Sequence, residues 1–376
     1  MVLSFYAEGF RILKNIAIVT HDMFGGGCER VIAQLANWFV TQKIKVTIVT
    51  EYKAPCFYDL CQEVQIISLS DKDRFSSKDI LTSYYKLRKK MIALQPDVIL
   101  AMPEKVNVWV VLAMMGTGIP VVVSERNNPA IYPRSKIKRI LRTLFYPIGA
   151  SGYIFQTREA SEFFSKSIRR KSIVLPNPLD LQRLPNNSAR EKRKEIVGVG
   201  RLEKQKNFHL LIDAFSDFLS THRDFILTIY GEGSMRVELE AYAKAVLPIG
   251  SYSFPGKKKD LLSRLSKASM FVLSSDYEGM PNVLIEAMAL GLPVVATDCP
   301  SGGPRELIQD GENGMLFPVN DRQALTKSMC VLVENENYAE SLGRNAIKIR
   351  KRLDIDKIGM LWLDYLKDVY RQKRKS

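Results

Sequence analysis

The chain has 376 residues, of which 46% are hydrophobic and 25% are charged, a composition that excludes a largely disordered or fibrous protein. This length is too great for one compact core and predicts two domains of ordinary size. The net charge of +15 is uneven: residues 1–178 hold 25 Lys+Arg against 14 Asp+Glu (+11), and residues 179–376 hold 30 against 26 (+4). Such an imbalance indicates an anionic surface as a partner of the first half.

Cysteine spacing and apolar runs predict the compartment. The five cysteines form no CxxC pair and no close-spaced framework, which indicates reduced thiols in a cytoplasmic protein. The first residues, MVLSFYAEGFRILK, lack the apolar core of a signal peptide. The longest apolar run, 108–123, is shorter than the roughly 20 residues that span a bilayer. The three histidines stand at no metal-ligand spacing, so we expect a protein without a zinc site or a membrane span.

Short apolar segments alternate with helical patterns through the first half of the chain. The first, 15–20, precedes residues 25–43, in which apolar side chains recur at helical spacing. Further strands are predicted at 45–50, 64–69, 96–102, 120–125 and 151–157. Strands separated by helices predict βαβ units and a parallel sheet.

A glycine-rich loop, HDMFGGGCER, lies between the first strand and the first long helix. The N–H groups at a helix N-terminus attract anions, so Gly26 and Gly27 are expected beside a phosphate. The loop is not GxGxxG, and Glu51 is the nearest candidate for the acidic residue of a dinucleotide site. A tight turn without a ligand is the alternative.

The segment SERNNPAIYPRSKIKRILRTLF begins at the end of a predicted strand. Glu125 and Arg126 are expected to face the cleft there, from the side of the first domain. The following helix is basic and amphipathic, a pattern typical of membrane-surface helices; its apolar positions are Ile137, Ile140, Leu141 and Leu144. The alternative is an ordinary helix with its apolar face on the core and a charged outer face.

The strand–helix pattern breaks between about 176 and 194, where proline, asparagine and charge indicate a linker. Strands resume at 195–200, 225–231, 251–256, 270–275 and 293–297, with helices between them, for example at 208–222 and 236–246. We expect an N-terminal domain over 1–178, a linker over 179–194, a C-terminal domain over 195–355 and a final helix over 356–376.

The stretch VGVGRLEKQKNFHLL places two cations beyond the first strand of the second domain. Arg201 and Lys206 precede a helix, where the helix dipole favours anions rather than cations. A ligand that needs positive charge explains this placement, and a diphosphate fits a guanidinium beside an ammonium. A solvated basic loop is the alternative.

Two glutamates in SSDYEGMPNVLIEAMALGLPVVAT stand seven residues apart. Glu278 lies in the loop after a strand, and Glu286 lies in a helix that is apolar on nearly every face and should be buried. A carboxylate accepts both hydroxyls of a vicinal diol, so Glu286 fits a ribose and Glu278 a second hydroxylated ring. The alternative is a buried Glu286 paired with an arginine such as Arg305.

One further pattern concerns metals. Asp71 and Asp73 form a DxD that offers oxygen ligands to a divalent ion. Their charged surroundings favour a solvated connection instead.

With these sites in view, the chain resembles the retaining glycosyltransferases of the GT-B fold, family 4, over essentially its whole length. The resemblance rests on the E-x7-E pair within EGMPNVLIEAMALGLPVVAT, and on GRLEKQKN, GGGCER, LPNPLD and GGPRELIQDGENGMLF. It implies two doubly wound Rossmann-like α/β domains that face each other across a cleft. It also implies transfer of a hexose or N-acetylhexosamine from a nucleotide-diphosphate sugar, with UDP expected.

The resemblance also implies roles for single residues. Arg201 and Lys206 would bind the donor diphosphate, Glu286 the ribose and Glu278 the sugar. The backbone of Gly279, Met280, Pro281 and Asn282 would complete the sugar site. Gly256 would lie by the base, and Gly26 and Gly27 would close over the phosphates. The catalytic set would be Arg201, Lys206 and Glu278.

The family implies a metal-independent reaction without a cofactor, in which the leaving phosphate helps to remove the acceptor proton. Many relatives carry histidine where this chain has Arg126, so a general base there is in doubt because arginine stays protonated. Members that build cell-surface glycans use polyprenyl-diphosphate acceptors at the cytoplasmic membrane face. This implies a glycan acceptor, a peripheral membrane location and contact of the basic domain with anionic lipid.

Two alternatives remain at this point. Another GT-B enzyme, such as a sugar-nucleotide epimerase or a glycogen synthase, shares the architecture. A nucleic-acid-binding protein also fits the charge, but the chain has no aromatic-basic RNP pattern, helix-turn-helix or zinc finger.

Overall fold

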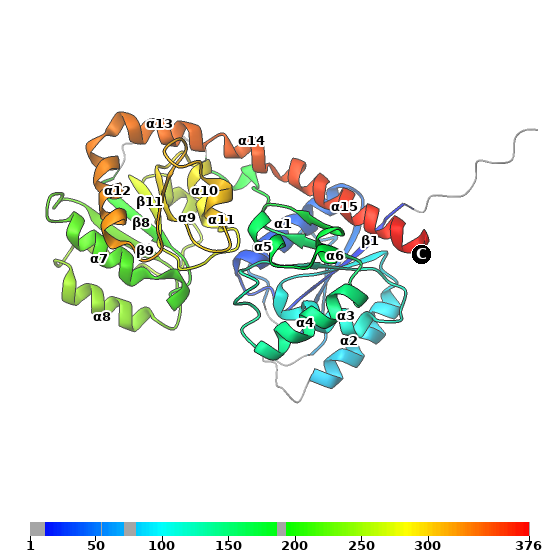
Figure 1. The fold of residues 1–376 in the computed structure, drawn as a ribbon. Coiled ribbons are helices and arrows are strands. Elements are labelled where there is room, and N and C mark those ends of the chain that lie inside the picture. The colour runs from blue at the N-terminus through cyan, green and yellow to red at the C-terminus, as the bar shows by residue number, and fades with distance from the viewer. Residues whose placement is uncertain (1–11, 54, 71–79, 186–192, 376) are drawn as a thin grey trace, which may run out of the picture.

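Two parallel sheets, each covered by helices, lie side by side in the structure (Figure 1). The structure, a computed structural model, describes residues 12–53, 55–70, 80–185 and 193–375. The expectation of two doubly wound α/β domains is confirmed. Asp71 and Asp73 and the first eleven residues lie outside the described residues.

The N-terminal sheet has the order β3-β2-β1-β4-β5-β6-β7. Its strands are β1 (Asn15–Thr20), β2 (Lys45–Thr50), β3 (Gln65–Ser68), β4 (Val98–Ala101), β5 (Val121–Ser124), β6 (Gly152–Phe155) and β7 (Ser172–Val174). Its helices are α1 (Gly27–Thr41), α2 (Ile80–Leu94), α3 (Glu104–Met114), α4 (Lys136–Gly149), α5 (Arg158–Glu162) and α6 (Lys166–Arg169). In β1, Ile16 and Ile18 pack on one face and Ala17 and Val19 on the other, so the sheet is buried on both faces.

The C-terminal sheet has the order β10-β9-β8-β11-β12-β13. Its strands are β8 (Glu195–Val199), β9 (Ile226–Tyr230), β10 (Tyr252–Ser253), β11 (Met270–Leu273), β12 (Val294–Thr297) and β13 (Met315–Phe317). Around it lie η3 (Lys204–Lys206), α7 (Phe208–Phe218), α8 (Arg236–Val246), α9 (Leu261–Leu265), α10 (Asn282–Ala289), α11 (Gly303–Leu307), α12 (Arg322–Glu334), α13 (Glu336–Ala346) and α14 (Ile349–Leu353). The edge strands β7 and β13, three residues each, were missed from sequence because each is too short to show a pattern.

Two segments cross between the domains side by side. One contains η2 (Leu181–Arg183), and the other joins α14 to α15 (Ile355–Lys375). The Leu179 N–H donates to the Leu353 carbonyl at 2.7 Å, and the Ile355 N–H donates to the Leu179 carbonyl at 3.1 Å. These bonds tie the two crossings together where the domains meet.

Helix α15 returns from the C-terminal domain and packs on α1 of the N-terminal domain (Figure 1). The Trp38 indole N–H donates to the Asp356 carboxylate at 2.7 Å. The Tyr365 hydroxyl accepts from the Tyr153 N–H at 2.8 Å, and it reaches the strand because Gly152 has no side chain: a Cβ there would lie 2.6 Å from that oxygen. The final helix therefore fastens the two domains together. Within the described ranges, no helix is both long and apolar enough to cross a bilayer.

Candidate active site

The candidate site lies where the carboxyl ends of both sheets face each other. From the C-terminal domain it receives the loop after β8, the loop after β11 and the first turns of α10. From the N-terminal domain it receives the glycine loop after β1 and the start of α1. Ligands of open α/β sheets bind at these ends, and here two such ends share one cleft.

Glu278 is buried in the loop after β11, with a relative exposure of 6%. Its carboxylate accepts from the Lys206 ammonium at 2.5 Å and from the Ser275 hydroxyl at 2.7 Å. The Glu278 N–H donates to the Pro300 carbonyl at 2.9 Å, which fixes the backbone of the loop. The structure thus brings together the loops after β8 and β11, and a buried charge is balanced by a partner of opposite sign.

Glu286 lies on α10 with a relative exposure of 5%, as its apolar neighbours in the sequence predicted. Its Oε1 accepts from the Arg30 guanidinium of the other domain at 2.5 Å. Its Oε2 is buried and has no hydrogen-bond partner among the described residues. Glu286 is indeed paired with an arginine, but the suggested Arg305 is the wrong one, because it binds Asp298 at 2.7 and 2.8 Å.

The glycine loop meets the donor side of the cleft through its backbone. The Gly27 carbonyl accepts from the Asn282 side-chain amide at 2.8 Å. A Cβ on Gly26 would lie 2.3 Å from a carboxylate oxygen of Glu29, so a side chain there would push the end of the Glu29 side chain aside. The loop thus lies opposite the start of α10; its closure over the donor phosphates stays a prediction.

The residues 279–282 are held from the N-terminal domain. A Cβ on Gly279 would lie 2.3 Å from the Arg126 carbonyl oxygen, so only glycine permits this approach. The Met280 N–H donates to the Gln156 side-chain oxygen at 3.2 Å. Pro281 is buried and stands immediately before α10. This loop therefore depends on both domains for its shape.

Asn177, from the LPNPLD segment, is the centre of the contacts between the domains. Its amide nitrogen donates to the Met280 carbonyl at 2.9 Å and to the Asn282 side-chain oxygen at 2.6 Å. Its side-chain oxygen accepts from Gln156 at 2.8 Å and also from Arg126. Sequence reasoning counted the segment as a matching motif but assigned no role to Asn177, since its partners lie between 21 and 105 residues away along the chain.

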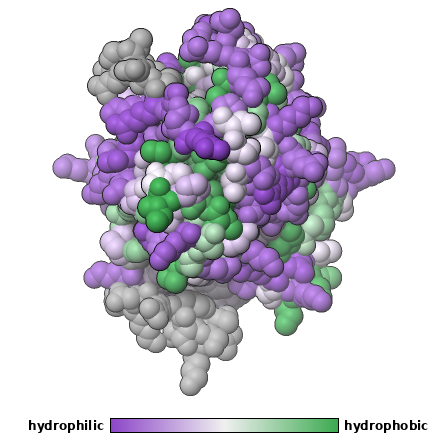
Figure 2. Space-filling view, turned by 90° about the vertical axis from the view of Figure 1, so that its left-hand side faces the viewer, coloured by the Kyte–Doolittle hydropathy of each residue, from purple (hydrophilic) through white to green (hydrophobic). Residues whose placement is uncertain are grey.

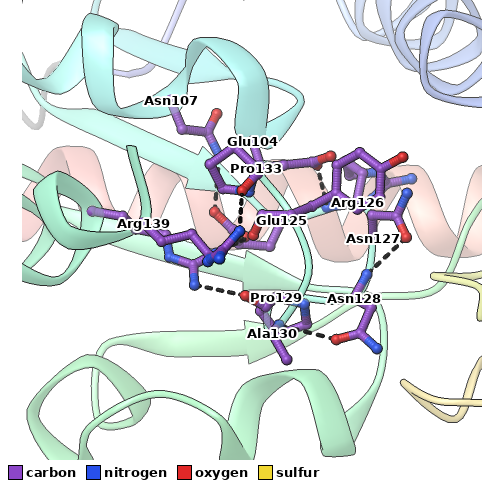
Figure 3. Close-up of polar contacts among 12 residues, drawn as sticks. Glu104, Asn107, Glu125, Arg126, Asn127, Asn128, Pro129, Ala130, Pro133 and Arg139 are labelled. Atoms are coloured by element: carbon purple, nitrogen blue, oxygen red, sulfur yellow. Dashed lines mark hydrogen bonds and ion pairs between the residues drawn. The ribbon is translucent and has the colours of Figure 1, made fainter. Parts of the chain in front are cut away.

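Glu125 corrects an expectation, because its side chain does not face the cleft. The carboxylate is 2% exposed and is bound inside the N-terminal domain by Arg142 at 3.1 Å and by the Tyr146 hydroxyl at 2.5 Å. The Asn107 amide donates to it at 3.4 Å. Glu125 is therefore a structural anion of this domain, and Figure 3 shows it among the side chains of the segment that follows β5.

Arg126 is 9% exposed and lies at the domain contact rather than open to the cleft. Its guanidinium binds Asn177 and stands 5.8 Å from the ring of Trp362 on α15. The backbone N–H of Arg126 donates to a Glu104 carboxylate oxygen at 3.2 Å (Figure 3). Burial lowers the pKa of Arg126, and burial with the nearby Glu125 charge raises the pKa of Glu104 to about 7.

Arg201 and Gly256 occupy the rim of the cleft. The Arg201 side chain is exposed beyond the end of β8. It forms no ion pair with any of the described residues, whereas Lys206 pairs with Glu278. Gly256 has a φ of +75°, which favours glycine, and its carbonyl accepts from the Gly231 N–H at 3.2 Å beside the end of β9. The adjacent Lys257 donates to the Gly25 carbonyl at 3.2 Å, a further contact between the domains that the sequence did not suggest.

A cavity of about 660 Å³ adjoins the site on the side of α4. It lies between the segment before α4 and the loops after β8 and β11. Its charged lining residues are three cations and two carboxylates: Arg134, Arg139, Lys204, Glu203 and Asp276. Arg134 and Lys204 are exposed, come from opposite domains and offer partners to an anionic group, beside the apolar surface of Ile131 and Tyr277.

Metal ligands do not gather in the cleft among the described residues. The group of His, Cys and carboxylate side chains with ligand atoms within 4.8 Å of one another consists of His222, Cys330 and Glu334, at the end of α7 and on α12. His222 and Glu334 already form an ion pair at 3.7 Å. The expectation of a metal-independent reaction stays a prediction.

Two family models match consecutive parts of the chain. "Glycosyltransferase Family 4" matches residues 25–183, and "Glycosyl transferases group 1" matches residues 182–349. The chain belongs to these glycosyltransferases. The first match contains the glycine loop, and the second contains both glutamates and both cations of the cleft.

Two relatives from Campylobacter jejuni match this glycosyltransferase over nearly its whole length. One is a GalNAc-α-(1→4)-GalNAc-α-(1→3)-diNAcBac-PP-undecaprenol α-1,4-N-acetyl-D-galactosaminyltransferase, 27% identical, with 95% of this chain and 99% of the relative covered. The other is an N-acetylgalactosamine-N,N′-diacetylbacillosaminyl-diphospho-undecaprenol 4-α-N-acetylgalactosaminyltransferase, also 27% identical, with 94% and 100% covered.

A solved structure confirms the fold. Anabaena HepE in complex with UDP and glucose superimposes with a TM-score of 0.80 at 18% identity, covering 94% of this chain and 100% of HepE. The glycosyltransferase thus has the GT-B arrangement that its sequence resembles.

Proposed function

We propose that this glycosyltransferase moves a hexose or N-acetylhexosamine from a UDP-sugar to a polyprenyl-diphosphate-linked glycan, with retention of the anomeric configuration. The observation that carries the proposal is the pair of buried glutamates, each with a cation, at the meeting of two sheet ends. The names of the Campylobacter relatives support the acceptor and the type of sugar, and the ligands of HepE support the donor.

In the proposed reaction, Lys206 and the exposed Arg201 bind the diphosphate and stabilise the charge that develops on the leaving nucleotide. Glu278, held by Lys206 and Ser275, accepts hydroxyls of the transferred sugar, and the 279–282 backbone completes that subsite. Glu286 accepts from the ribose. The acceptor attacks from the face that the nucleotide leaves, and the departing phosphate takes its proton. The protein supplies position and charge rather than a nucleophile.

We propose that the acceptor enters through the cavity beside α4. Its diphosphate would lie near Arg134 and Lys204, and its polyprenyl chain would remain in the membrane. The reaction would then take place at the cytoplasmic face of a membrane, to which the basic N-terminal domain binds peripherally.

Helix α4 supports this location, because a stripe of its apolar side chains faces outward. One stripe is exposed by 58% to 70% and consists of Ile137, Ile140, Leu144 and Ile148. The opposite side of the helix is buried through Arg142 and Tyr146, which bind Glu125. An exposed apolar stripe flanked by Lys136 and Lys138 is the surface that an interfacial helix presents to anionic lipid. The alternative of an apolar side packed on the core describes the other side of the helix, where Leu141 and Phe145 pack against the N-terminal core.

The proposed activity is tested by a donor screen. We would incubate the enzyme with a panel of UDP- and GDP-sugars and synthetic polyprenyl-diphosphate glycans, and detect products by mass spectrometry. We expect one UDP-sugar to extend the glycan, and we expect Glu278→Ala to abolish the product because the sugar loses its carboxylate. Hydrolysis or epimerisation of the donor without transfer, or no binding of any nucleotide sugar by the folded protein, would contradict the proposal.

Membrane binding is tested by flotation with vesicles. We expect the wild type to float with phosphatidylglycerol-containing vesicles and less so at high salt, since the basic surface is screened. Ile140→Glu should lower the bound fraction roughly tenfold or more, because an exposed isoleucine that would insert into the membrane interface is replaced by a charge.

The matched control is Ile249→Glu, an isoleucine that is 96% exposed on the C-terminal domain. The end of the molecule formed by that domain is predominantly hydrophilic, with small groups of hydrophobic residues (Figure 2). We expect Ile249→Glu to float like the wild type. An equal loss of vesicle binding in Ile140→Glu and Ile249→Glu, or no flotation of the wild type, would contradict the proposed role of α4.

A further inference from the structure

The Arg30–Glu286 ion pair links the two domains directly through the cleft. Arg30 lies in the first turn of α1, immediately after the glycine loop, and Glu286 lies on α10 of the other domain. The Arg30 nitrogen is 2.5 Å from Glu286 Oε1. The relative exposures of the two side chains, 20% and 7%, place the pair mostly out of water. Such a pair depends on its geometry, because removing either partner leaves a buried charge.

Neighbouring residues keep the Arg30 side chain pointed toward Glu286. Its guanidinium stands 5.9 Å from the ring centre of Tyr58, and the Tyr58 hydroxyl donates to the Gly26 carbonyl at 2.8 Å. The Gly27 carbonyl next to it is bound by Asn282, one turn before Glu286 on α10. The glycine loop, Arg30 and the start of α10 therefore form one connected set of contacts.

The two oxygens of Glu286 differ in what they bind. Oε1 is occupied by Arg30, whereas Oε2 is buried without a hydrogen-bond partner in the described part of the chain. A buried carboxylate oxygen without a partner is costly, because its desolvation is not offset. The oxygen therefore indicates a hydrogen-bond donor that arrives with a ligand.

We propose that Arg30 is a positioning residue that holds Glu286 through Oε1 and leaves Oε2 for a ribose hydroxyl of the donor. The inference rests on the proposed nucleotide-sugar donor and adds a residue of the acceptor domain to its recognition. Since Arg30 and Glu286 belong to different domains, Glu286 is held in place only while the cleft is closed. Ribose recognition and closure of the cleft are thereby coupled.

Calorimetric titration with UDP and 2′,3′-dideoxy-UDP tests the proposal. We expect the wild type to bind UDP roughly 10- to 100-fold more tightly than dideoxy-UDP, because a hydrogen bond to a charged group contributes about that much to affinity. In Arg30→Ala this ratio should fall to about threefold or less, because Glu286 is no longer fixed. Arg30→Lys should give an intermediate ratio, since an ammonium provides charge without the guanidinium fork.

The ratio separates positioning from a merely structural role. A variant that weakens UDP and dideoxy-UDP equally, or that leaves both unchanged, would overturn the proposal. If Arg30→Ala does not fold, the ratio for Arg30→Lys decides in the same way. The matched control is Arg350→Ala, which removes an arginine bound to the Ala289 carbonyl at the other end of α10 and should keep the wild-type ratio.

Failure of this inference can be told from failure of the proposed function. If the wild type itself does not distinguish UDP from dideoxy-UDP, the ribose contact and the role of Arg30 are both overturned. Transfer from a nucleotide sugar in the donor screen would still stand in that case, because it is measured independently.

Discussion

Replacing Lys206 by alanine is expected to lower kcat/KM about 100- to 1,000-fold, the usual cost of removing one group that stabilises charge in a transition state. Lys206 is the cation closest to Glu278, at 2.5 Å, and only 14% of its side chain is exposed. In the proposed reaction its ammonium faces the leaving diphosphate, so its loss acts mainly on kcat. Steady-state kinetics with the donor found in the screen measures the effect.

The same substitution should also destabilise the fold. It leaves the Glu278 carboxylate buried with Ser275 as its hydrogen-bond partner, and breaking a buried pair costs about 3–5 kcal/mol. The double variant Lys206→Ala/Glu278→Gln removes the unpaired charge, so it should regain most of the stability without regaining activity. Denaturant unfolding and kinetics on both variants separate the two effects.

The control for Lys206 is Lys194→Ala, since Lys194 also pairs with a carboxylate but the pair with Asp224 is exposed. Exposed ion pairs contribute little to the free energy of unfolding, so we expect no measurable change in the activity or stability of Lys194→Ala. A Lys206→Ala enzyme that keeps kcat within threefold of the wild type would show that Lys206 is not part of the reaction.

Replacing Asn177 by alanine is expected to lower the free energy of unfolding by about 2–4 kcal/mol and to raise KM for the donor more than it lowers kcat. The side chain makes four hydrogen bonds at the domain contact: it donates two to Met280 and Asn282 of the C-terminal domain and accepts two from Gln156 and Arg126 of its own domain. Its removal leaves the buried amide of Gln156 and the guanidinium of Arg126 without this acceptor. The 279–282 loop then loses its fixed position, which weakens sugar binding.

Urea unfolding and donor titration measure these changes. The matched control is Asn345→Ala, which removes two exposed hydrogen bonds within the C-terminal domain, one donated to the Glu312 carbonyl at 2.9 Å and one accepted from the Lys348 ammonium at 2.8 Å. We expect that variant to resemble the wild type. If Asn177→Ala is as stable as Asn345→Ala and binds donor equally well, the network around Asn177 does not hold the donor loop.

Much of the architecture could be predicted from the sequence, because its signals are local. The strands are continuous apolar runs, since a parallel sheet covered on both faces buries every side chain, and ten of the eleven predicted strands overlap observed ones by at least four residues. The exception is the predicted strand at 251–256, of which only Tyr252–Ser253 pairs. Placement of Glu278 at a strand end and Glu286 inside α10 also follows from local patterns.

The sequence by itself therefore determined the two-domain parallel fold and the burial of Glu286, since periodicity and strand ends depend on neighbours along the chain. Only the tertiary structure decided which groups meet. Glu286 binds Arg30 across 256 positions, Glu125 turns inward to Arg142, and α4 presents its apolar stripe to the outside. Periodicity shows that a helix has two faces, but which face is buried depends on the partners that packing brings to it. Here the buried Glu125 carboxylate binds Arg142 and Tyr146 on the inner side of α4, and the apolar stripe on the outer side is left exposed.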